Sequence, residues 1–488
     1  MIVSLVMFGA QAHASAYYFL DSGTRSIGRG GAYVVGADDV SAQYYNPAAL
    51  ANVKRTMVNV NVWGVNQYIH FDRADDDAGE YDAIENESPP IIEPQGGVVI
   101  PLRGVAPFLK WTTLAVGLYV PTSPYLKYPT KGAQRYALND SLIWQIYAGP
   151  SVAQRMPFAE WITVGAGLQY TFLRVDESIT ATSCTTFEQD DDGYCPGGDK
   201  ANDILLEIKS WDPMEWSANF GVMVEPTPWL KFGGSAQPPI HYEPLGTMTA
   251  TFSDDNALVS SQLEPNKDGK YSYTDEDIRV LVDVPWIVRA GVEVRPIEKV
   301  AIELDGTWTQ WSALAELSIT DINLKLAKKE GGQLTEDLVV SDDVNFATGY
   351  KDAWSARLGG DYTANDWLKV RAGVHYETSA IPDTTQGVQL VDGTKYGFGA
   401  GGTFTVAKRV ALDVAFAQQF LGNRTISDSD LRQQALIYDL DLLNPEETKT
   451  TVGEGRVVGN GDFVSRLTFV GVGATVYLGA DDATAARQ

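Results

Sequence analysis

The stretch that decides the fold is 354–377, WSARLGGDYTANDWLKVRAGVHYE. Apolar residues such as Trp354 and Leu358 alternate with polar ones, and the alternation resumes at Leu368 after a short turn at 364–366. A period of two places successive side chains on opposite faces of a β-strand. This stretch therefore predicts two antiparallel strands joined by a tight turn.

The same alternation recurs from about residue 56 onward, for example over 163–173, 300–309 and 470–478. Many of these strands run about 10 residues or more, whereas strands of soluble proteins average about 5–6 residues. The connections alternate strictly between short turns and long loops. A soluble sandwich also alternates, but long strands with short turns on one side and long loops on the other are typical of an outer-membrane barrel.

Counting the strands between these connections predicts fourteen, and an even number places both ends on the short-turn side. The predicted starts are 56, 96, 112, 141, 160, 205, 229, 278, 299, 350, 367, 395, 409 and 461. We therefore predict an all-β fold, a 14-stranded antiparallel transmembrane β-barrel over 56–479, followed by a polar C-terminal tail at 480–488.

Composition and motifs argue against several classes of function. The 488 residues carry a net charge of -26, which argues against a nucleic-acid partner because phosphate binding needs clustered Lys and Arg. The chain has neither G-x-S-x-G nor a Walker A motif, and its 4 histidines lack metal-ligand spacing. The G-x-G-x-x-G match at 397–402 lies inside an alternating strand rather than at a strand-to-helix turn. We expect no enzyme, no cofactor and no metal.

The beginning of the chain resembles an export signal. Ile2 to Phe8 form an apolar run, and Ala12–Ala14 and Ala14–Ala16 fit an A-x-A cleavage pattern. We therefore expect a signal peptide over 1–16. The basic segment of such signals is missing, so we expect the natural start to lie further upstream. The alternative is a short buried strand.

The long loops hold much of the acid. Glu188, Asp190 and Asp192 before a glycine resemble the start of a calcium loop, but flanking helices are not predicted. A solvated acidic loop is the alternative that we favour. Cys184 and Cys195 lie in the same predicted loop, and an exported protein permits a disulfide there.

The segment before the barrel, predicted over 17–55, is not strand-like throughout and has a size that would fill a fourteen-strand lumen. It contains the motifs GRGGA at 28–32, ADD at 37–39 and YYNPAAL at 44–50. With these motifs, and with QRYAL at 134–138 and RAGVHY at 371–376, the chain resembles the FadL-like outer-membrane transporters of long-chain fatty acids and other hydrophobic compounds.

The resemblance implies a barrel closed by an N-terminal hatch, to which we assign Gly28, Gly30, Gly31, Asn46, Pro47 and Ala48. It implies capture of a hydrophobic ligand at loops 178–204 and 244–277, and sideways release into the membrane through a gap at the third strand. Gly117 and Pro121 are the candidates for that gap, since Pro cannot donate a ladder hydrogen bond. The alternative is a strand that ends at Val120.

Four cations on the predicted lumen face could bind a ligand carboxylate: Arg289, Arg357, Lys369 and Arg371. The alternative, which we favour, is that they pair with lumen acids such as Glu293, Asp361 and Glu377. The acidic loops argue against a fatty-acid anion as the first ligand captured. We expect a monomer surrounded by outer-membrane lipid and lipopolysaccharide. An open porin or an adhesive barrel is the alternative function.

Overall fold

The structure is a computed structural model that describes most of the chain. The described ranges are 22–77, 79–104, 109–256, 263–314, 316–327, 329–330, 333–334, 338–341, 343–439 and 449–478. The predicted signal peptide (1–16), the first residues of the predicted hatch (17–21) and the predicted polar tail (480–488) lie outside the described residues.

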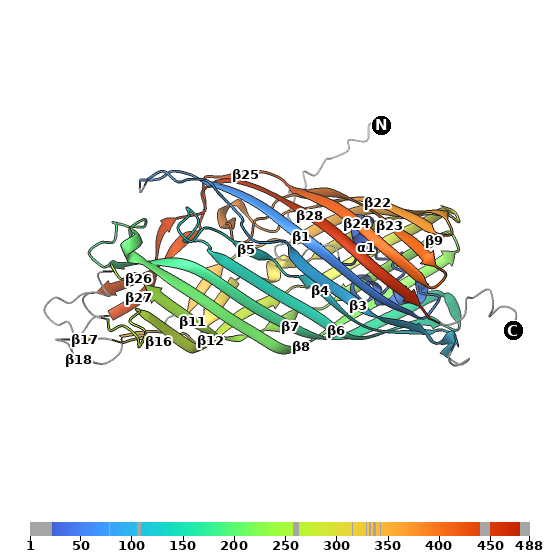
Figure 1. The fold of residues 1–488 in the computed structure, drawn as a ribbon, viewed down its shortest axis with the longest axis horizontal. Helices are drawn as coiled ribbons and strands as arrows, with labels where there is room; N and C mark the ends of the chain where they lie inside the picture. The colour runs from blue at the N-terminus through green and yellow to red at the C-terminus, as the bar shows by residue number, and fades with distance from the viewer. Residues whose placement is uncertain are drawn as a thin grey trace, which may run out of the picture.

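The described residues form a closed barrel of fourteen antiparallel strands (Figure 1). The wall strands are β1 (Met57–Arg73), β3 (Ile91–Pro101), β4 (Thr112–Thr122), β6 (Asp140–Met156), β7 (Ala159–Thr185), β8 (Asp203–Thr227), β9 (Leu230–Gln237), β13 (Ile287–Ile297), β14 (Val300–Thr309), β21 (Ala353–Asn365), β22 (Leu368–Glu377), β23 (Lys395–Ala407), β24 (Val410–Leu421) and β28 (Gly461–Tyr477). β28 closes the ring by pairing with β1. The predicted fold class and strand count are confirmed.

Two wall strands begin away from their predicted positions. β3 starts at Ile91 rather than 96, because its pairing with β1 continues outward. The eighth strand, predicted to start at 278, is divided into β12 (Ser272–Val284) and β13 by Pro285. A proline has no N–H for the ladder, so it interrupts a strand without changing its direction in the barrel.

Further strands lie at the long-loop end, some in the wall sheet and some in two separate two-stranded sheets, so parts of the predicted loops 178–204 and 244–277 are strands. These are β2 (Ile84–Glu85), β5 (Tyr125–Lys127), β10 (Ile240–Tyr242), β11 (Leu245–Phe252), β15 (Glu316–Thr320), β16 (Leu324–Leu326), β17 (Lys329–Glu330), β18 (Gln333–Leu334), β19 (Leu338–Val340), β20 (Val344–Ala347), β25 (Arg424–Ile426), β26 (Arg432–Asp439) and β27 (Lys449–Val457). Short 3₁₀ turns are η2 (Leu102–Gly104), η4 (Lys200–Asn202), η5 (Trp311–Ala313) and η6 (Asp383–Thr385).

The wall is apolar outside and polar inside. On β1, Val58, Val60 and Val62 are exposed while Asn59 and Asn61 are buried. Exposed aromatic residues stand beside the short turns, namely Phe158, Trp161, Trp229 and Trp367. An apolar band with an aromatic girdle is the surface that a barrel presents to lipid.

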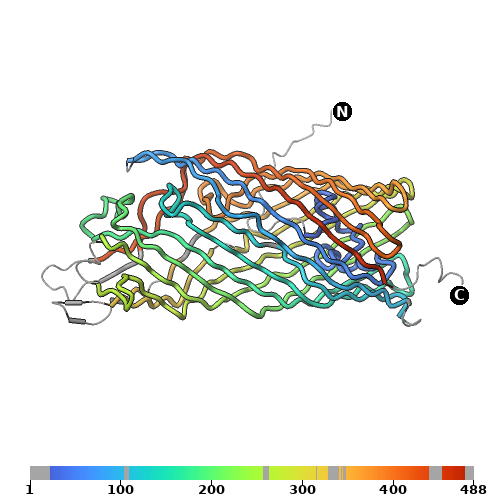
Figure 2. Tube along the Cα trace, in the orientation of Figure 1, coloured from blue at the N-terminus to red at the C-terminus, as the bar shows by residue number. Residues whose placement is uncertain are grey.

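The N-terminal segment, residues 22–55, lies inside the barrel near the short-turn end (Figure 2). It contains α1 (Thr24–Gly28), α2 (Ala42–Tyr45) and η1 (Pro47–Asn52). Every residue from 22 to 50 except Asp38 is buried. Within the described ranges, no helix has the length and apolar character needed to cross a membrane.

Candidate functional site

Two arginines anchor the N-terminal segment to the barrel wall. The Nε atom of Arg25 lies 3.1 Å from an Asp413 carboxylate oxygen on β24. Arg29 places its Nη2 atom 2.8 Å from Glu303 on β14 and its Nη1 atom 3.2 Å from Asp361 on β21. Both arginines are buried, and a buried charge is tolerated only when it is paired. The wall carboxylates therefore fix the position of the segment.

Backbone N–H groups of the segment also donate hydrogen bonds to carboxylates of the wall. The N–H groups of Tyr33 and Val34 both donate to Asp305 Oδ2, at 2.7 and 2.9 Å. The next two N–H groups, at 35 and 36, donate to the two oxygens of Glu303 at 2.6 and 2.9 Å. Four successive backbone donors without helical partners are thus satisfied by the wall.

The predicted hatch glycines lie in the turn that follows α1. Gly30 and Gly31 have φ of 62° and 81°, a conformation that L side chains rarely adopt. A Cβ at Gly28 would lie 3.2 Å from a backbone atom of β23. On the wall, a Cβ at Gly373 would lie 1.9 Å from the carbonyl oxygen of Arg29. Glycine is needed on both sides because the two backbones approach so closely.

The predicted Asn46-Pro47-Ala48 motif joins the segment to β8. Asn46 Nδ2 donates to the carbonyl oxygens of Val34 and Val222, at 3.1 and 3.2 Å. Its Oδ1 accepts the N–H of Ala48 at 3.0 Å, which caps η1. Pro47 is the first residue of η1, where its missing N–H costs nothing.

Three adjoining apolar cavities occupy the long-loop half of the barrel. The inner cavity includes Val175, Val282 and Trp311, the side cavity includes Leu138, Tyr350 and Leu390, and the outer cavity includes Phe252, Ile322 and Leu324. Ile208 and Ile319 line all three, so the cavities are direct neighbours that share walls.

The charges along these cavities are few. Glu177 and Asp283 line the inner cavity, and Glu177 and Arg432 line the side cavity. The lining of the outer cavity contains no charged side chain. The cavities are therefore suited to an apolar ligand, since the Asp283 side chain pairs with the exposed His241 and leaves Glu177 and Arg432 as the charged side chains of the lining.

The four cations predicted to bind a ligand carboxylate lie around the N-terminal segment and line none of these three cavities. Their contacts are Arg289 over the Tyr44 ring at 4.5 Å, Arg357 with Glu377 at 3.9 Å, Lys369 with Asp38 at 3.4 Å and Arg371 with Asp361 at 3.1 Å. Arg357, Lys369 and Arg371 thus contact carboxylates, as in the alternative of pairing with lumen acids, whereas Arg289 lies over an aromatic ring.

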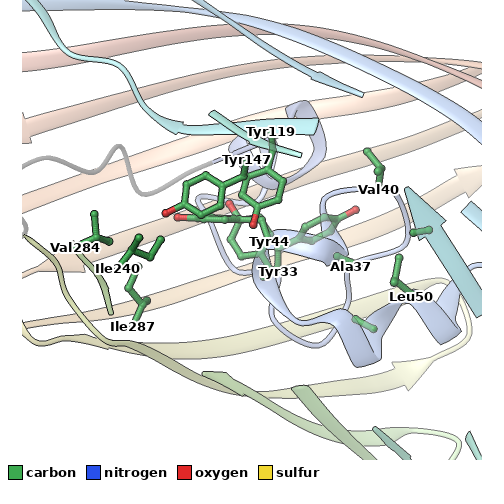
Figure 3. Close-up of a cluster of buried hydrophobic side chains, with 14 of the residues drawn as sticks. Tyr33, Ala37, Val40, Tyr44, Leu50, Tyr119, Tyr147, Ile240, Val284 and Ile287 are labelled. Carbon is green, nitrogen blue, oxygen red and sulfur yellow. The ribbon is translucent and has the colours of Figure 1, made fainter. Parts of the chain in front are cut away.

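An aromatic cluster lies where the N-terminal segment meets the wall strands (Figure 3). Tyr119 of β4 stacks on Tyr147 of β6 with ring centroids 5.1 Å apart, and Tyr44 of α2 packs against Tyr119 at 5.4 Å. Val284 lines the inner cavity and belongs to the same buried cluster. A ligand in the inner cavity would thus meet a floor that is built partly from the N-terminal segment.

The wall is incomplete between β3 and β4. Their ladder runs outward only as far as Gly96↔Leu118. Beyond it, the described residues include no ladder pair between the two strands: β3 continues against β1 to Ile91, and β4 continues against β6. Pro94 lies on the unpaired part of β3, and Pro121 lies in a register irregularity of β4. Neither proline can donate a ladder hydrogen bond.

Gly117, the other predicted gap residue, lies below the break and has a different environment. Its Cβ would come within 2.3 Å of Gln43 Oε1 and 2.9 Å of Val40 Cγ2. This glycine makes room for the N-terminal segment beside the last paired residues of β3 and β4.

One side-chain contact spans the gap. Ser123, which follows β4, donates its hydroxyl to Glu93 Oε1 at 2.6 Å, and both residues are buried. Two residues along β3, Gln95 accepts a hydrogen bond from Ser41 of the N-terminal segment at 2.9 Å. The strand β3 therefore both borders the gap and contacts the N-terminal segment.

At the long-loop end, the QRYAL motif ties two loops together. Arg135 pairs with Asp203 at 3.0 Å, and the Tyr136 hydroxyl donates to the same carboxylate at 2.7 Å. Burial, together with the hydrogen bond to Asp203, raises the pKa of Tyr136 above its ordinary value. Tyr136 and Leu138 then line the side cavity.

The acidic loop holds a disulfide. Cys184 and Cys195 are joined, with Cα atoms 5.8 Å apart. Glu188 Oε2 accepts the N–H of Thr185, and Asp190 Oδ1 accepts the N–H of Asp192. These acids thus cap turns. Among the described residues, no group of three or more His, Cys, Asp or Glu side chains could hold a metal ion.

Several functional candidates escaped sequence reasoning. Arg25 and Arg29 have no local pattern that marks them as anchors, because their partners lie hundreds of positions away. The spacing of turns assigns Glu93 to a loop. A single acid that follows the apolar Ile91 and Ile92 and precedes Pro94 in a barrel sequence is nevertheless a usable signal.

Fold and site define the class of this protein: a β-barrel channel of the bacterial outer membrane with apolar cavities. A family model described as outer membrane protein transport protein (OMPP1/FadL/TodX) matches residues 5–450. The chain belongs to this family, which transports hydrophobic compounds across the outer membrane.

Individual relatives are distant. The chain is 20% identical to the outer membrane protein NMB0088 of Neisseria meningitidis serogroup B, over 85% of this chain and 88% of that one. A FadL homologue from Pseudomonas aeruginosa is 17% identical, with a TM-score of 0.70, over 95% of this chain and 100% of the other. The toluene transporter TodX of Pseudomonas putida is 16% identical, with a TM-score of 0.60, over 96% and 100%. At such low sequence identities, the structural similarity establishes the fold alone.

Proposed function

We propose that this protein captures a hydrophobic compound at its long-loop end, passes it through the three apolar cavities and releases it sideways into the membrane through the gap between β3 and β4. The observation that carries the proposal is the row of apolar cavities, which share Ile208 and Ile319 and could join into one path. Each buried methylene contributes about 0.8 kcal/mol, so such a path can extract an apolar molecule from water.

The charges favour a neutral compound over a fatty-acid anion. A buried carboxylate needs a cation or several donors, yet the charged side chain of the inner cavity is Glu177, because Asp283 pairs with the exposed His241. Arg432, the cation of the side cavity, stacks on Tyr194 at 3.8 Å from the ring centroid. Long-chain fatty acids remain within the proposed ligand range, as the more weakly favoured class.

The position of the N-terminal segment supports sideways rather than straight release. The segment is buried across the barrel below the aromatic floor, and its Arg25 and Arg29 are ion-paired to the wall. A straight path would require these buried pairs to break. A sideways path needs only a small movement at Tyr119 and at the contact between Ser41 and Gln95.

The double substitution Pro94→Val and Pro121→Val tests this route, because it restores two backbone donors at the gap. With each hydrogen bond worth about 0.5–1.5 kcal/mol, we expect uptake of labelled 1-dodecanol by cells to fall about tenfold. Pro296→Val, near a short turn of β13, is the matched control and should leave uptake unchanged. Full uptake by a correctly assembled double variant would contradict release through this gap.

A further inference from the structure

The lateral gap is bordered by a buried carboxylate. Glu93 lies on the part of β3 that has no ladder partner on β4, and its side chain points inward between outward-facing Ile92 and Pro94. It is 1% exposed. It is thus a buried acid on the strand that borders the proposed exit.

Glu93 is incompletely satisfied. One oxygen accepts the hydroxyl of Ser123 at 2.6 Å. The other oxygen has no hydrogen-bond partner among the described residues, and these residues also provide no ion pair for Glu93. Trp63, opposite Glu93 on β1, is fully buried, and its indole N–H is the nearest donor to Glu93 but does not reach good hydrogen-bonding geometry.

Such a group is costly for the barrel. An unpaired buried carboxyl group weakens the folded state, and a native protein keeps few of them without a reason. The fold could be built with an apolar residue at this position, since β3 has its ladder to β1 and Trp63 already fills the space on that side. The position of Glu93 at the gap points to a role in passage.

We propose that Glu93 is the specificity-determining residue of the lateral gap: its carboxylate admits neutral hydrophobic compounds and rejects compounds that carry a carboxylate of their own. Its hydrogen bond to Ser123 closes the gap when no ligand is present. This inference rests on the proposed function, and it adds a filter at the exit to the neutral preference of the cavities.

The physical basis is charge repulsion at close range. A ligand that leaves between β3 and β4 must pass the Glu93–Ser123 contact, which joins the two sides of the gap. Two like charges in a poorly hydrated site repel each other far more strongly than in water. A hydroxyl group, by contrast, can donate to the free oxygen of Glu93 as it passes.

The test compares two ligands of equal chain length, 1-dodecanol and dodecanoate, in cells that produce this protein as their sole transporter of such compounds. The medium is kept well above the pKa of the free acid. We expect the wild type to take up the alcohol faster than the acid. Glu93→Gln should raise dodecanoate uptake about tenfold, as removal of one close like charge predicts, and leave dodecanol uptake unchanged.

Three further variants sharpen the result. Glu93→Asp keeps the charge and should keep the wild-type ratio. Ser123→Lys places a cation beside Glu93 and should raise dodecanoate uptake even if Glu93→Gln fails to assemble. Asp352→Asn removes a carboxylate that accepts a serine hydroxyl in the same way but lines none of the three cavities and lies away from the gap, and it should not reproduce the effect of Glu93→Gln.

The outcomes separate this inference from the proposed function. An unchanged ratio in assembled Glu93→Gln and Ser123→Lys, or a change caused by Asp352→Asn instead, would overturn the filter while transport itself stands. Uptake of neither compound by the wild type would instead refute the proposed function.

Discussion

At the scale of single residues, the lumen charges act mainly on the chain itself. Arg29 is fully buried and lies within 3.6 Å of three carboxylates, those of Glu293, Glu303 and Asp361. Without this cation, three acids would face one another in a poorly hydrated interior. Arg29 therefore decides whether the N-terminal segment stays docked.

Replacement of Arg29 by Met should destabilise the docked segment. Loss of one partner from a buried ion pair costs about 3–5 kcal/mol, so we expect faster proteolysis of the segment and a lower unfolding temperature in detergent. Arg279→Ala is the control: Arg279 pairs with Asp321 at the surface, where such a pair contributes about 0–1 kcal/mol. Equal stability of the two variants would show that Arg29 does not anchor the segment.

At the scale of elements, glycines on neighbouring strands make room for the turn after α1. A Cβ at Gly359 on β21, Gly373 on β22 or Gly399 on β23 would lie 2.1, 1.9 or 2.1 Å from a carbonyl oxygen of that turn. The small residues of these strands therefore form a shallow seat for the N-terminal segment rather than a nucleotide-binding loop.

Gly373→Ala should push the segment off this seat. Backbone atoms on both sides cannot yield cheaply, and overpacking costs about 1–3 kcal/mol or more. We expect a higher ion conductance in planar bilayers, since a displaced segment leaves the lumen open. Gly306→Ala, whose Cβ would meet its nearest atom at 3.8 Å, should behave like the wild type. A wild-type conductance for Gly373→Ala would contradict the seat.

The disulfide acts on the outer loops. Cys184 lies on β7 where that strand pairs in parallel with β26. The backbone of Cys195 forms a parallel β-bridge with Gly455 on β27. Closing a loop of this length stabilises it by roughly 2–3 kcal/mol in the chain-entropy view. We expect Cys184→Ala, or reduction, to speed proteolysis between 186 and 202 while the barrel stays intact, as mass spectrometry of the fragments would report.

At the scale of the whole molecule, the protein is a wide barrel with its own N-terminal segment inside. A fourteen-strand ring would leave a broad water-filled lumen if it were empty. The segment makes contacts with strands as far apart in the ring as β3, β8, β14 and β24. We propose that it blocks the straight path through the barrel.

Deletion of residues 17–48 should therefore raise single-channel conductance well above that of the full chain. Heat-modifiable migration on gels serves as the control that the barrel still assembles. An intact barrel with unchanged current would mean that this segment does not close the lumen.

The sequence predicted the strands of the barrel wall but only some residues of the candidate site. The alternation around Trp354 and the spacing of turns predicted the strand count, and the missing donor of Pro121 predicted a weak place in β4. Alternation near Ile91 was obscured by Pro94, so β3 was predicted too short and Glu93 was missed.

What the sequence determined by itself is the barrel, because a period of two and the lengths of connections are local properties written in neighbouring residues. What only the tertiary structure decided is which charges meet. Arg29 and Glu303 are 274 positions apart in the chain. Glu93 and Ser123 are 30 positions apart and meet where β3 and β4 no longer pair. Closing the ring brings such groups together, and no periodicity in the chain encodes that distance.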